Sequence, residues 1–384
     1  MVTVAIVGAG VAGLSCGLTL QALGYRVIWL DKSRGVGGRL ATRRLTPGGW
    51  VDHGVRYWSP QSAELQALTQ QLVGQGIVRP WSAQGFTWEQ SLQPKAQTVY
   101  CAERGLNAIA KYLAQGCDIR RQHRVTTLTK LSDGWQVIAE SPDGQLSLAT
   151  SAVVIAMPAP QVVPLLEPLA AAAGLNQVTY DPCLSLLTTY KTLPERPSLD
   201  HSKGWYVEAN HPVLSWLSLD SSKASQPQLK AVLMQSQPEF AAQYLEQLDR
   251  LAPDNPAVEA LTKNAVLAML TAAGAIVPGL EQPQTHRLHR WRYSVVNQPY
   301  PQALLTTRWP SLVGCGDWCC PSTMTNLDAA YQSGLAAAAY LNAHNACPLH
   351  LLKFGASVGK KVLRILIGAV GGCGNLFRCQ PHLF

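Results

Sequence analysis

Three glycines with an acidic residue downstream are the residues of this chain best suited to bind a phosphorylated ligand. Gly8, Gly10 and Gly13 have the spacing Gly-x-Gly-x-x-Gly, and Asp31 comes 18 residues after Gly13. Gly8 allows a tight turn, Gly10 lets the backbone approach a pyrophosphate, and Gly13 lets a helix pack closely on a sheet. The Asp31 carboxylate can accept hydrogen bonds from a ribose diol. The pattern therefore indicates a dinucleotide-binding site.

The elements that must position these residues occur in the required order. The sequence predicts an apolar strand over residues 4–7, a helix over 14–23 and a second strand over 25–30. The N–H groups and the dipole of the helix N-terminus would then meet the phosphates. A glycine motif alone is weak evidence, but its register with strand, helix, strand and acid is specific.

A second glycine motif, Gly37-Gly38-Arg39, follows shortly after Lys32. A paired glycine lets the chain turn beside a cofactor, and the Arg39 guanidinium supplies a second phosphate contact. A dehydrogenase that binds only NAD does not need this extension. Here the chain resembles flavoproteins of the amine oxidase and glutathione reductase type, in which the motif helps to hold FAD. The alternative is an arginine-rich loop that faces solvent.

A third motif lies near residue 317. An apolar strand over 311–314 ends in Gly316-Asp317, and an alanine-rich helix begins near Asn326. Asp317 can hold a ribityl or phosphate-side hydroxyl, while the helix N-terminus near Leu327 directs N–H groups at the flavin pyrimidine. This dipole would favour the anionic reduced flavin. The alternative for the helix is ordinary core packing.

Further stretches, in the same order along the chain, resemble the bacterial renalase-like flavoproteins of the flavin amine oxidase superfamily. The resemblance spans residues 2–342 and is carried by residues 38–44, 51–58, 105–113, 153–160, 180–183, 289–293 and 312–317. It implies an α/β fold, with a Rossmann-type FAD-binding domain of the glutathione reductase/amine oxidase type and an inserted α+β substrate domain. A covalent link between flavin and a cysteine is possible in this superfamily, but no feature of this sequence favours one, so we expect FAD to be bound non-covalently.

The motifs and the resemblance together give the expected site residues. Cofactor-binding residues are expected at Gly8, Gly10, Val11, Ala12, Gly13, Asp31, Lys32, Gly38, Arg39, Gly54, Val55, Arg56, Val125, Gly316, Asp317 and Leu327. Aromatic side chains can hold a flat substrate against a flavin, so the substrate-facing candidates are Trp291, Tyr57 and Tyr180, together with Arg56. Core packing is the alternative for each aromatic residue. The histidines form no cluster in the sequence, no carboxylate pair stands out, and no metal site is expected.

Arg56 departs from the resembling flavoproteins, whose sequence at this stretch is close to Asp-Leu-Gly-Ala-Gln-Tyr-Phe and therefore has Gln. The arginine could bind a substrate phosphate or stabilise the reduced-flavin anion. It could equally pair with Asp52 as a structural contact.

Composition predicts a large enzyme that works in the cytoplasm. The chain has 384 residues, of which 47% are hydrophobic and 14% charged, which is enough for two domains. The start of the chain does not read as a signal peptide, and the ten cysteines lack metal-ligand spacing, so we expect reduced thiols. Five of the eight net positive charges lie in the last 39 residues, and the remaining +3 does not predict a nucleic-acid groove.

That basic tail, residues 346–384, is amphipathic if its 353–370 segment is helical. Such a segment can make a peripheral contact with an anionic membrane surface. Two alternatives remain, which are a helix packed on the protein and a loose end interrupted by glycines.

The resulting domain division is discontinuous. We expect the FAD-binding domain over 1–59, 99–159 and 301–345, and the substrate domain over 60–98 and 160–300. Helices are predicted over 62–74, 105–115 and 239–251, and strands over 184–191, 205–208 and 213–219. A further strand is predicted over 263–271, with helix as the alternative.

The resemblance implies oxidation of a small molecule of the NAD(P)H type, a misreduced 2- or 6-dihydronicotinamide dinucleotide. The flavin would accept a hydride and dioxygen would be the final acceptor, which requires no catalytic base. Three alternatives stay open. A flavin amine oxidase would need an aromatic cage, an isoprenoid desaturase would need a long apolar tunnel, and an assembly or regulatory flavoprotein would need no turnover.

Overall fold

The computed structural model describes residues 2–46, 48–172, 174–194, 199–227, 229–320, 324 and 326–344. The tail expected over 346–384, with its amphipathic segment at 353–370, lies outside these residues. Within them, every helix is too short or too polar to cross a membrane.

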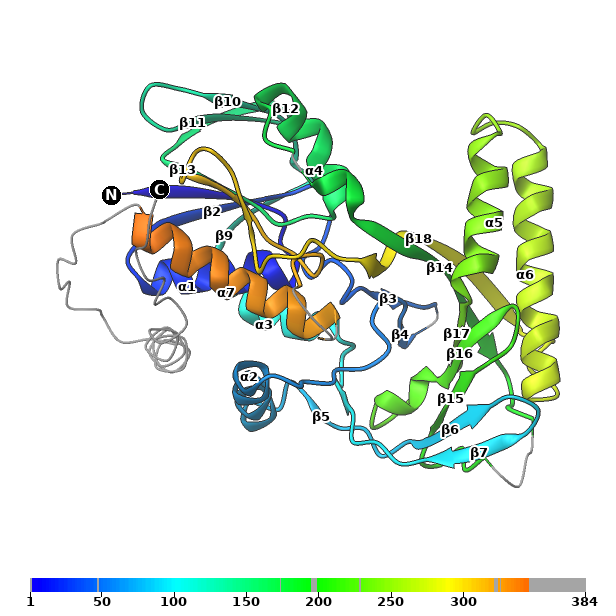
Figure 1. Cartoon of the computed structure of the whole chain (residues 1–384). Helices are drawn as coiled ribbons and strands as arrows, with labels where there is room; N and C mark the ends of the chain where they lie inside the picture. The colour runs from blue at the N-terminus through cyan, green and yellow to red at the C-terminus, as the bar shows by residue number, and fades with distance from the viewer. Residues whose placement is uncertain are drawn as a thin grey trace, which may run out of the picture.

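A six-stranded sheet that is almost entirely parallel forms one half of the molecule (Figure 1). Its order is β19-β20-β13-β1-β2-β9, and only the edge pair β19–β20 is antiparallel. The strands are β1 (Thr3–Val7), β2 (Arg26–Asp31), β9 (Asp118–Arg121), β13 (Ala152–Ile155), β19 (Leu305–Thr306) and β20 (Leu312–Gly314). The strands predicted over 4–7, 25–30 and 311–314 are confirmed. A central parallel strand is buried on both faces, which explains why the four residues of β1 after Thr3 are all apolar.

Each face of this sheet carries its own layer. Val4 and Ile6 pack towards α1 (Val11–Ala22) and α7 (Asn326–His344) on one face. Ala5 and Val7 point to the other face, which is covered by α4 (Ala159–Leu166) and an antiparallel three-stranded sheet. The strands of that small sheet are β10 (Arg124–Lys130), β11 (Trp135–Ser141) and β12 (Gly144–Thr150).

Two more helices extend the α1 side of the sheet. These are α2 (Ala63–Gly74) and α3 (Asn107–Leu113), at the helices predicted over 62–74 and 105–115. Leu65 and Leu68 of α2 share a buried cluster with Leu14 of α1 and Tyr331 of α7. The structure therefore places α2, which belongs to the 60–98 stretch expected on the substrate side, against the nucleotide-binding half.

A seven-stranded mixed sheet forms the other half, in the order β18-β14-β17-β16-β15-β6-β7. Only the β6–β15 pair is parallel. The strands are β6 (Gln84–Trp88), β7 (Leu92–Lys95), β14 (Thr179–Tyr190), β15 (Trp205–Ala209), β16 (Leu214–Leu219), β17 (Lys230–Ser236) and β18 (Thr285–Gln298). The strands predicted over 184–191, 205–208 and 213–219 are confirmed. Short hairpin-like pairs complete the junction, namely β3 (Thr42–Arg44) with β4 (Trp50–Asp52) and β5 (Arg79–Pro80) with β8 (Tyr100–Cys101).

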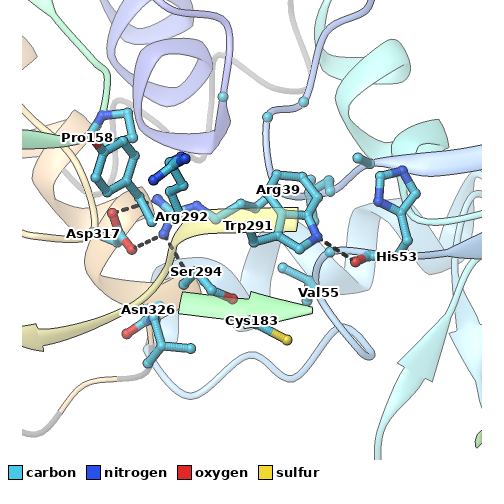
Figure 2. A pocket seen from close by; sticks show the side chains of 18 of the residues that line it. Arg39, His53, Val55, Pro158, Cys183, Trp291, Arg292, Ser294, Asp317 and Asn326 are labelled. Carbon is cyan, nitrogen blue, oxygen red and sulfur yellow. Dashed lines mark hydrogen bonds and ion pairs between the residues drawn. The ribbon is translucent and has the colours of Figure 1, made fainter. Parts of the chain in front are cut away.

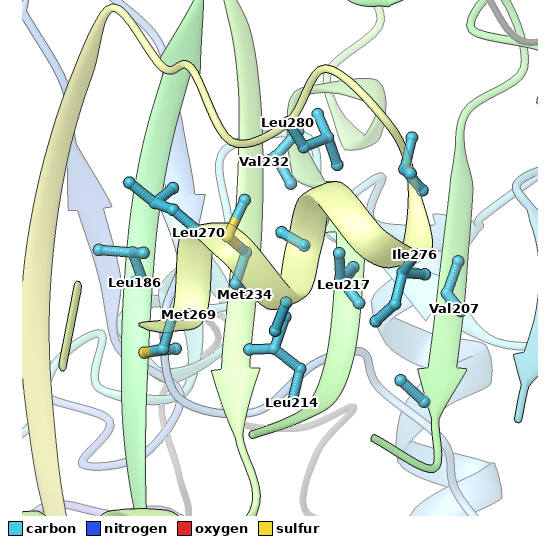
Figure 3. Close-up of a cluster of buried hydrophobic side chains, with 14 of the residues drawn as sticks. Leu186, Val207, Leu214, Leu217, Val232, Met234, Met269, Leu270, Ile276 and Leu280 are labelled. Atoms are coloured by element: carbon cyan, nitrogen blue, oxygen red, sulfur yellow. The ribbon is translucent and has the colours of Figure 1, made fainter. Parts of the chain in front are cut away.

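One face of the mixed sheet is covered by α5 (Pro238–Asp249) and α6 (Ala257–Ile276), which stand together in Figure 1. Met269, Leu270 and Ile276 of α6 lie over apolar side chains of the strands (Figure 3). The helix predicted over 239–251 is confirmed, but the strand predicted over 263–271 is wrong because this stretch is the middle of α6. Its buried residues, which lie between Ala265 and Ile276, recur at the three- to four-residue spacing of a helix and not at the alternate positions of a strand.

Candidate active site

The glycine-rich turn after β1 needs glycine at its three positions for three different reasons. Gly8 has φ +110°, and a Cβ there would lie 2.4 Å from the carbonyl oxygen of Ala156. A Cβ on Gly13 would lie 2.0 Å from the carbonyl oxygen of Gly8, so this glycine allows α1 to pack on the turn. Around Gly10 no atom of the described residues lies within 4 Å of an added Cβ, and Gly10 lines a cavity. A phosphate can therefore approach the Gly10 backbone closely.

That cavity has a volume of 1760 Å³ and lies between the two sheets. Binding sites for one small molecule typically occupy about 300–1,000 Å³, so the cavity can hold a cofactor and a substrate together. The expected cofactor residues that line it are Gly8, Gly10, Val11, Ala12, Asp31, Lys32, Gly38, Arg39, Gly54, Val55, Arg56, Val125, Gly316, Asp317 and Leu327. Gly13 lies beneath its wall. Among the substrate-facing candidates, Tyr57, Arg56 and Trp291 line the cavity.

Asp31 ends β2 with its carboxylate held in place by the backbone. It accepts a hydrogen bond of 2.7 Å from the Ala9 N–H and another of 2.7 Å from the Ser33 N–H. Lys32 donates to the Gln161 side chain at 2.9 Å, and burial lowers the pKa of Lys32. An acid fixed at the tip of the second strand, beside a glycine-rich turn, is the arrangement that binds a ribose diol.

Arg39 and Asp317 form an ion pair across the cavity (Figure 2). Both terminal nitrogens of Arg39 donate to the Asp317 carboxylate, at 2.5 and 2.6 Å, and Nη1 also donates to the Ser294 carbonyl oxygen. Burial would lower the pKa of Arg39, but the charge and hydrogen bonds of Asp317 outweigh it and the pKa is raised. The two residues expected to contact the cofactor thus fix each other's position.

Tyr180 does not line the cavity, which corrects its expected substrate-facing position. Its ring lies 6.0 Å from the Arg39 guanidinium carbon, and its hydroxyl oxygen accepts a hydrogen bond from the Ala159 N–H. Burial raises the pKa of Tyr180, so its hydroxyl stays neutral. Tyr180 therefore packs against the Arg39 guanidinium.

Residues 53–56 run between the two halves and are hydrogen-bonded to both. On the nucleotide side, the N–H groups of His53 and Val55 donate to the carbonyl oxygens of Ala41 and Arg39. On the other side, carbonyl oxygens of this stretch accept hydrogen bonds from side chains around the mixed sheet. The donors are Trp291 and Ser185 to His53, Gln235 to Gly54, and Lys223 to Arg56.

Trp291 brings two histidines together, although the sequence shows no histidine cluster. The His53 and His289 rings lie 4.5 Å apart, and the Trp291 ring lies 5.4 Å from His53 and 4.6 Å from His289. Trp291 also donates its indole N–H to the His53 carbonyl oxygen at 2.7 Å (Figure 2). Burial, aided by the charges of His289, Arg43 and Arg287, lowers the pKa of His53 to about 3. The imidazole is therefore neutral at physiological pH.

A buried carboxylate pair is also present, contrary to the expectation that none stands out. Asp52 and Asp220 share the ammonium group of Lys223, at 3.2 and 2.5 Å, and all three side chains are at most 1% exposed. Asp220 and Lys223 belong to one short 3-10 helix (Asp220–Lys223), three residues apart, which is the only local signal for the cluster. Because Asp52 pairs with Lys223, its expected alternative pairing with Arg56 is wrong.

Arg56 lies at the cavity wall, and no acidic side chain of the described ranges forms an ion pair with it. Its Nε donates to the Gln235 side-chain oxygen at 2.7 Å and its Nη2 to the Ser215 hydroxyl at 2.9 Å. The guanidinium carbon lies 4.9 Å from the centre of the Trp216 ring. Tyr57 packs against the same Trp216 ring, with 5.6 Å between ring centres.

The cavity fits a flavin dinucleotide. The open Gly10 backbone, the N-terminus of α1 and the fixed Asp31 carboxylate suit the dinucleotide part. Asn326, Leu327 and Ala330, from the first turns of α7, line the far part of the cavity, where a helix N-terminus stabilises negative charge. In the described residues there is no group of three metal-ligating side chains.

Fold and site together define a flavin-dependent oxidoreductase. Residues 6–72 match the family model described as NAD(P)-binding Rossmann-like domain, and residues 74–342 match the model described as flavin containing amine oxidoreductase. The second match spans most of the chain, which therefore belongs to the flavin containing amine oxidoreductase family.

Individual relatives agree with this assignment. Mouse (Mus musculus) renalase is 25% identical over 318 residues, which cover 77% of this chain and 86% of the mouse protein. Wild-type putrescine oxidase bound to putrescine has a similar fold, with a TM-score of 0.67 and 13% identity over 89% of this chain and 99% of the oxidase. A triple mutant of putrescine oxidase with redesigned cofactor binding gives the same TM-score, identity and coverage.

Proposed function

We propose that this protein binds FAD and oxidises a misreduced nicotinamide dinucleotide, the 2- or 6-dihydro isomer, with dioxygen as the final acceptor. The similarity to mouse renalase over most of both chains supports the reaction class. A bound flavin supplies the hydride acceptor. Loss of a hydride converts the dihydronicotinamide to the oxidised dinucleotide, and the two electrons pass with protons to dioxygen to give hydrogen peroxide.

The charged residues that line the cavity are the observation on which we choose between an amine and a dinucleotide substrate. An amine substrate is cationic at neutral pH, so a free carboxylate beside an aromatic cage would favour it. The carboxylates that line the cavity are otherwise engaged: Asp317 pairs with Arg39, Asp249 with Arg292, Asp31 binds backbone N–H groups, and Asp181 accepts from Asn297. Arg56 adds a positive charge, so the cavity favours an anionic molecule such as a dinucleotide.

The remaining residues near Trp291 suit hydride transfer without a base. His53 is neutral and His289 has a lowered pKa, mainly because both are buried. Trp291, fixed by its hydrogen bond to His53, offers a flat surface for a nicotinamide ring. Tyr57 lines another part of the cavity. These side chains orient a substrate and exclude water, which is what hydride transfer requires of the protein.

Anaerobic flavin spectroscopy tests the proposal. The purified protein is mixed in turn with 6-dihydro-NAD, ordinary NADH, NADPH and putrescine, and the absorbance of the oxidised flavin is followed. We expect rapid bleaching by the dihydro isomer and slow or no bleaching by the other donors. Bleaching by putrescine alone would establish the amine oxidase alternative. If none of these donors reduces the flavin, the proposed reaction is wrong.

A further inference from the structure

Arg56 differs from Arg39, which lines the same cavity, in having no counter-ion among the described residues. Arg39 lies against Asp317 and its pKa is raised. No carboxylate of the described residues lies within 4 Å of the Arg56 guanidinium, and Glu208, which lies in its neighbourhood, pairs with Lys95 at 2.5 Å. Burial consequently lowers the pKa of Arg56. An arginine nevertheless stays protonated in proteins, so the cavity contains a permanent charge that the described residues do not balance.

The guanidinium is held rigidly by neutral groups. Gln235 accepts from its Nε while donating its own amide N–H to the Gly54 carbonyl oxygen at 2.8 Å. Ser215 accepts from its Nη2 while donating to the Ser236 carbonyl oxygen at 2.9 Å. The Trp216 ring lies against the guanidinium at 4.9 Å. Every one of these contacts orients Arg56, and none removes its charge.

Part of the guanidinium remains open to the cavity. Nη1 makes no hydrogen bond to the described residues. It is nevertheless not one of their buried polar atoms, so it is accessible from the cavity. Arg56 lines the cavity, so the two N–H groups of Nη1 can reach a molecule inside it. A planar donor group fixed in advance is well suited to bind phosphate or carboxylate oxygens.

We propose that Arg56 is the centre of an oxyanion-binding subsite, which receives a phosphate or carboxylate group of the substrate. The subsite lies on the opposite side of β14 from Trp291, because Arg56 donates to Gln235 of β17 and Ser215 of β16, whereas Trp291 belongs to β18, and β14 lies between β18 and β17. A substrate can therefore place a flat ring near Trp291 and an anionic group at Arg56. This inference rests on the proposed function, because it names the group by which the cavity recognises a dihydronicotinamide.

Ligand pairs that differ in one anionic group test the subsite. The first pair is the 6-dihydro isomer of nicotinamide mononucleotide and its riboside, which differ by one phosphate. The second pair is the riboside with a carboxamide or a carboxylate on the ring. KM and kcat are measured for the wild-type holoenzyme, for Arg56→Gln and for Arg56→Lys. The matched control is Arg26→Gln, which removes an exposed positive charge at the start of β2, the end remote from Asp31.

We expect the wild type to prefer the anionic member of one pair at least tenfold in KM, and Arg56→Gln to lose that preference. Arg56→Lys should keep part of it because the charge remains, and Arg26→Gln should keep all of it. The pair that responds shows whether phosphate or carboxylate is bound. Equal preferences in wild type and Arg56→Gln, with flavin retained, would overturn the subsite.

A binding measurement separates this inference from the proposed reaction. Inorganic phosphate and acetate are titrated into the oxidised holoenzyme, and the change in flavin absorbance is recorded. If no dihydronicotinamide reduces the flavin but one anion binds at least tenfold more weakly to Arg56→Gln than to wild type, the reaction is wrong and the subsite stands. If both anions bind equally to wild type and variant, the subsite is wrong whatever the reaction.

Discussion

The buried cluster of Lys223, Asp52 and Asp220 gives the sharpest test of how the two halves are joined. In Lys223→Met the two carboxylates lose their shared ammonium group in a place where all three side chains are at most 1% exposed. Removing one partner of a buried ion pair costs about 3–5 kcal/mol. We therefore expect the free energy of unfolding to fall by about 3–5 kcal/mol at pH 8.

The loss should shrink as the pH falls. Burial, assisted by the charge of Asp52, raises the pKa of Asp220 to about 6 even though Lys223 opposes the rise. Without Lys223 the pKa rises further, so the folded variant binds a proton that the unfolded chain releases. A carboxyl group whose pKa is raised in the folded state contributes stability that is fully present at low pH. This contribution is lost as the pH rises towards the raised pKa, by about 1.4 kcal/mol per pH unit for one proton. The deficit at pH 6 should therefore be smaller than at pH 8.

Urea denaturation of the holoenzyme at pH 6 and pH 8, followed by circular dichroism, measures both effects. The control is Lys263→Met, which breaks an exposed pair with Glu259 and should leave the free energy of unfolding nearly unchanged at either pH. Adding Asp220→Asn to Lys223→Met should restore part of the stability at pH 8. The reasoning is refuted if Lys223→Met stays within about 1 kcal/mol of wild type at both pH values, well below the expected cost.

Two further predictions concern the glycine-rich turn and His53. Gly10→Ala should weaken flavin binding about 10- to 100-fold, because its Cβ enters the cavity and overpacking costs about 1–3 kcal/mol. Gly13→Ala should mainly lower the stability of the apoprotein. Flavin titration and thermal unfolding measure the two effects, and normal flavin binding by Gly10→Ala would contradict the first. Because the pKa of His53 is about 3 in the folded state, the unfolded chain takes up a proton below pH 6.5 and stability falls by about 1.4 kcal/mol per pH unit as the pH drops. His53→Gln should flatten this slope in denaturation curves from pH 7 to pH 5, and an unchanged slope would show that His53 does not cause it.

The nucleotide-binding half could be predicted because its signals are local. The turn after β1, the helix that follows it and Asp31 are contained in one short stretch, and each residue type has a separate steric or hydrogen-bonding reason. The closing motif at Gly316-Asp317 is equally compact. Among the elements that were predicted, the one over 263–271 was wrong, because a short apolar run is ambiguous until the full length of α6 is considered.

The charged and aromatic groups of the site could not be predicted in the same way, because their partners are far apart in sequence. Asp52 meets Lys223 across 171 residues, and Trp291 meets His53 across 238. Tyr180 was expected on the cavity wall because of its type, but the packing of β14 places it behind Arg39. Such contacts depend on how the two sheets pack, which no local pattern encodes.

The hydrogen bonding of residues 53–56 has a mechanical consequence. The N–H groups of His53 and Val55 are bound on the nucleotide side, and four side-chain hydrogen bonds from around the mixed sheet hold carbonyl oxygens of this stretch. Swinging one sheet away from the other would break this connection in the middle of the cavity. These hydrogen bonds therefore oppose a hinge motion between the two halves. A substrate would then be selected by the shape and charge of a cavity whose two walls are already joined.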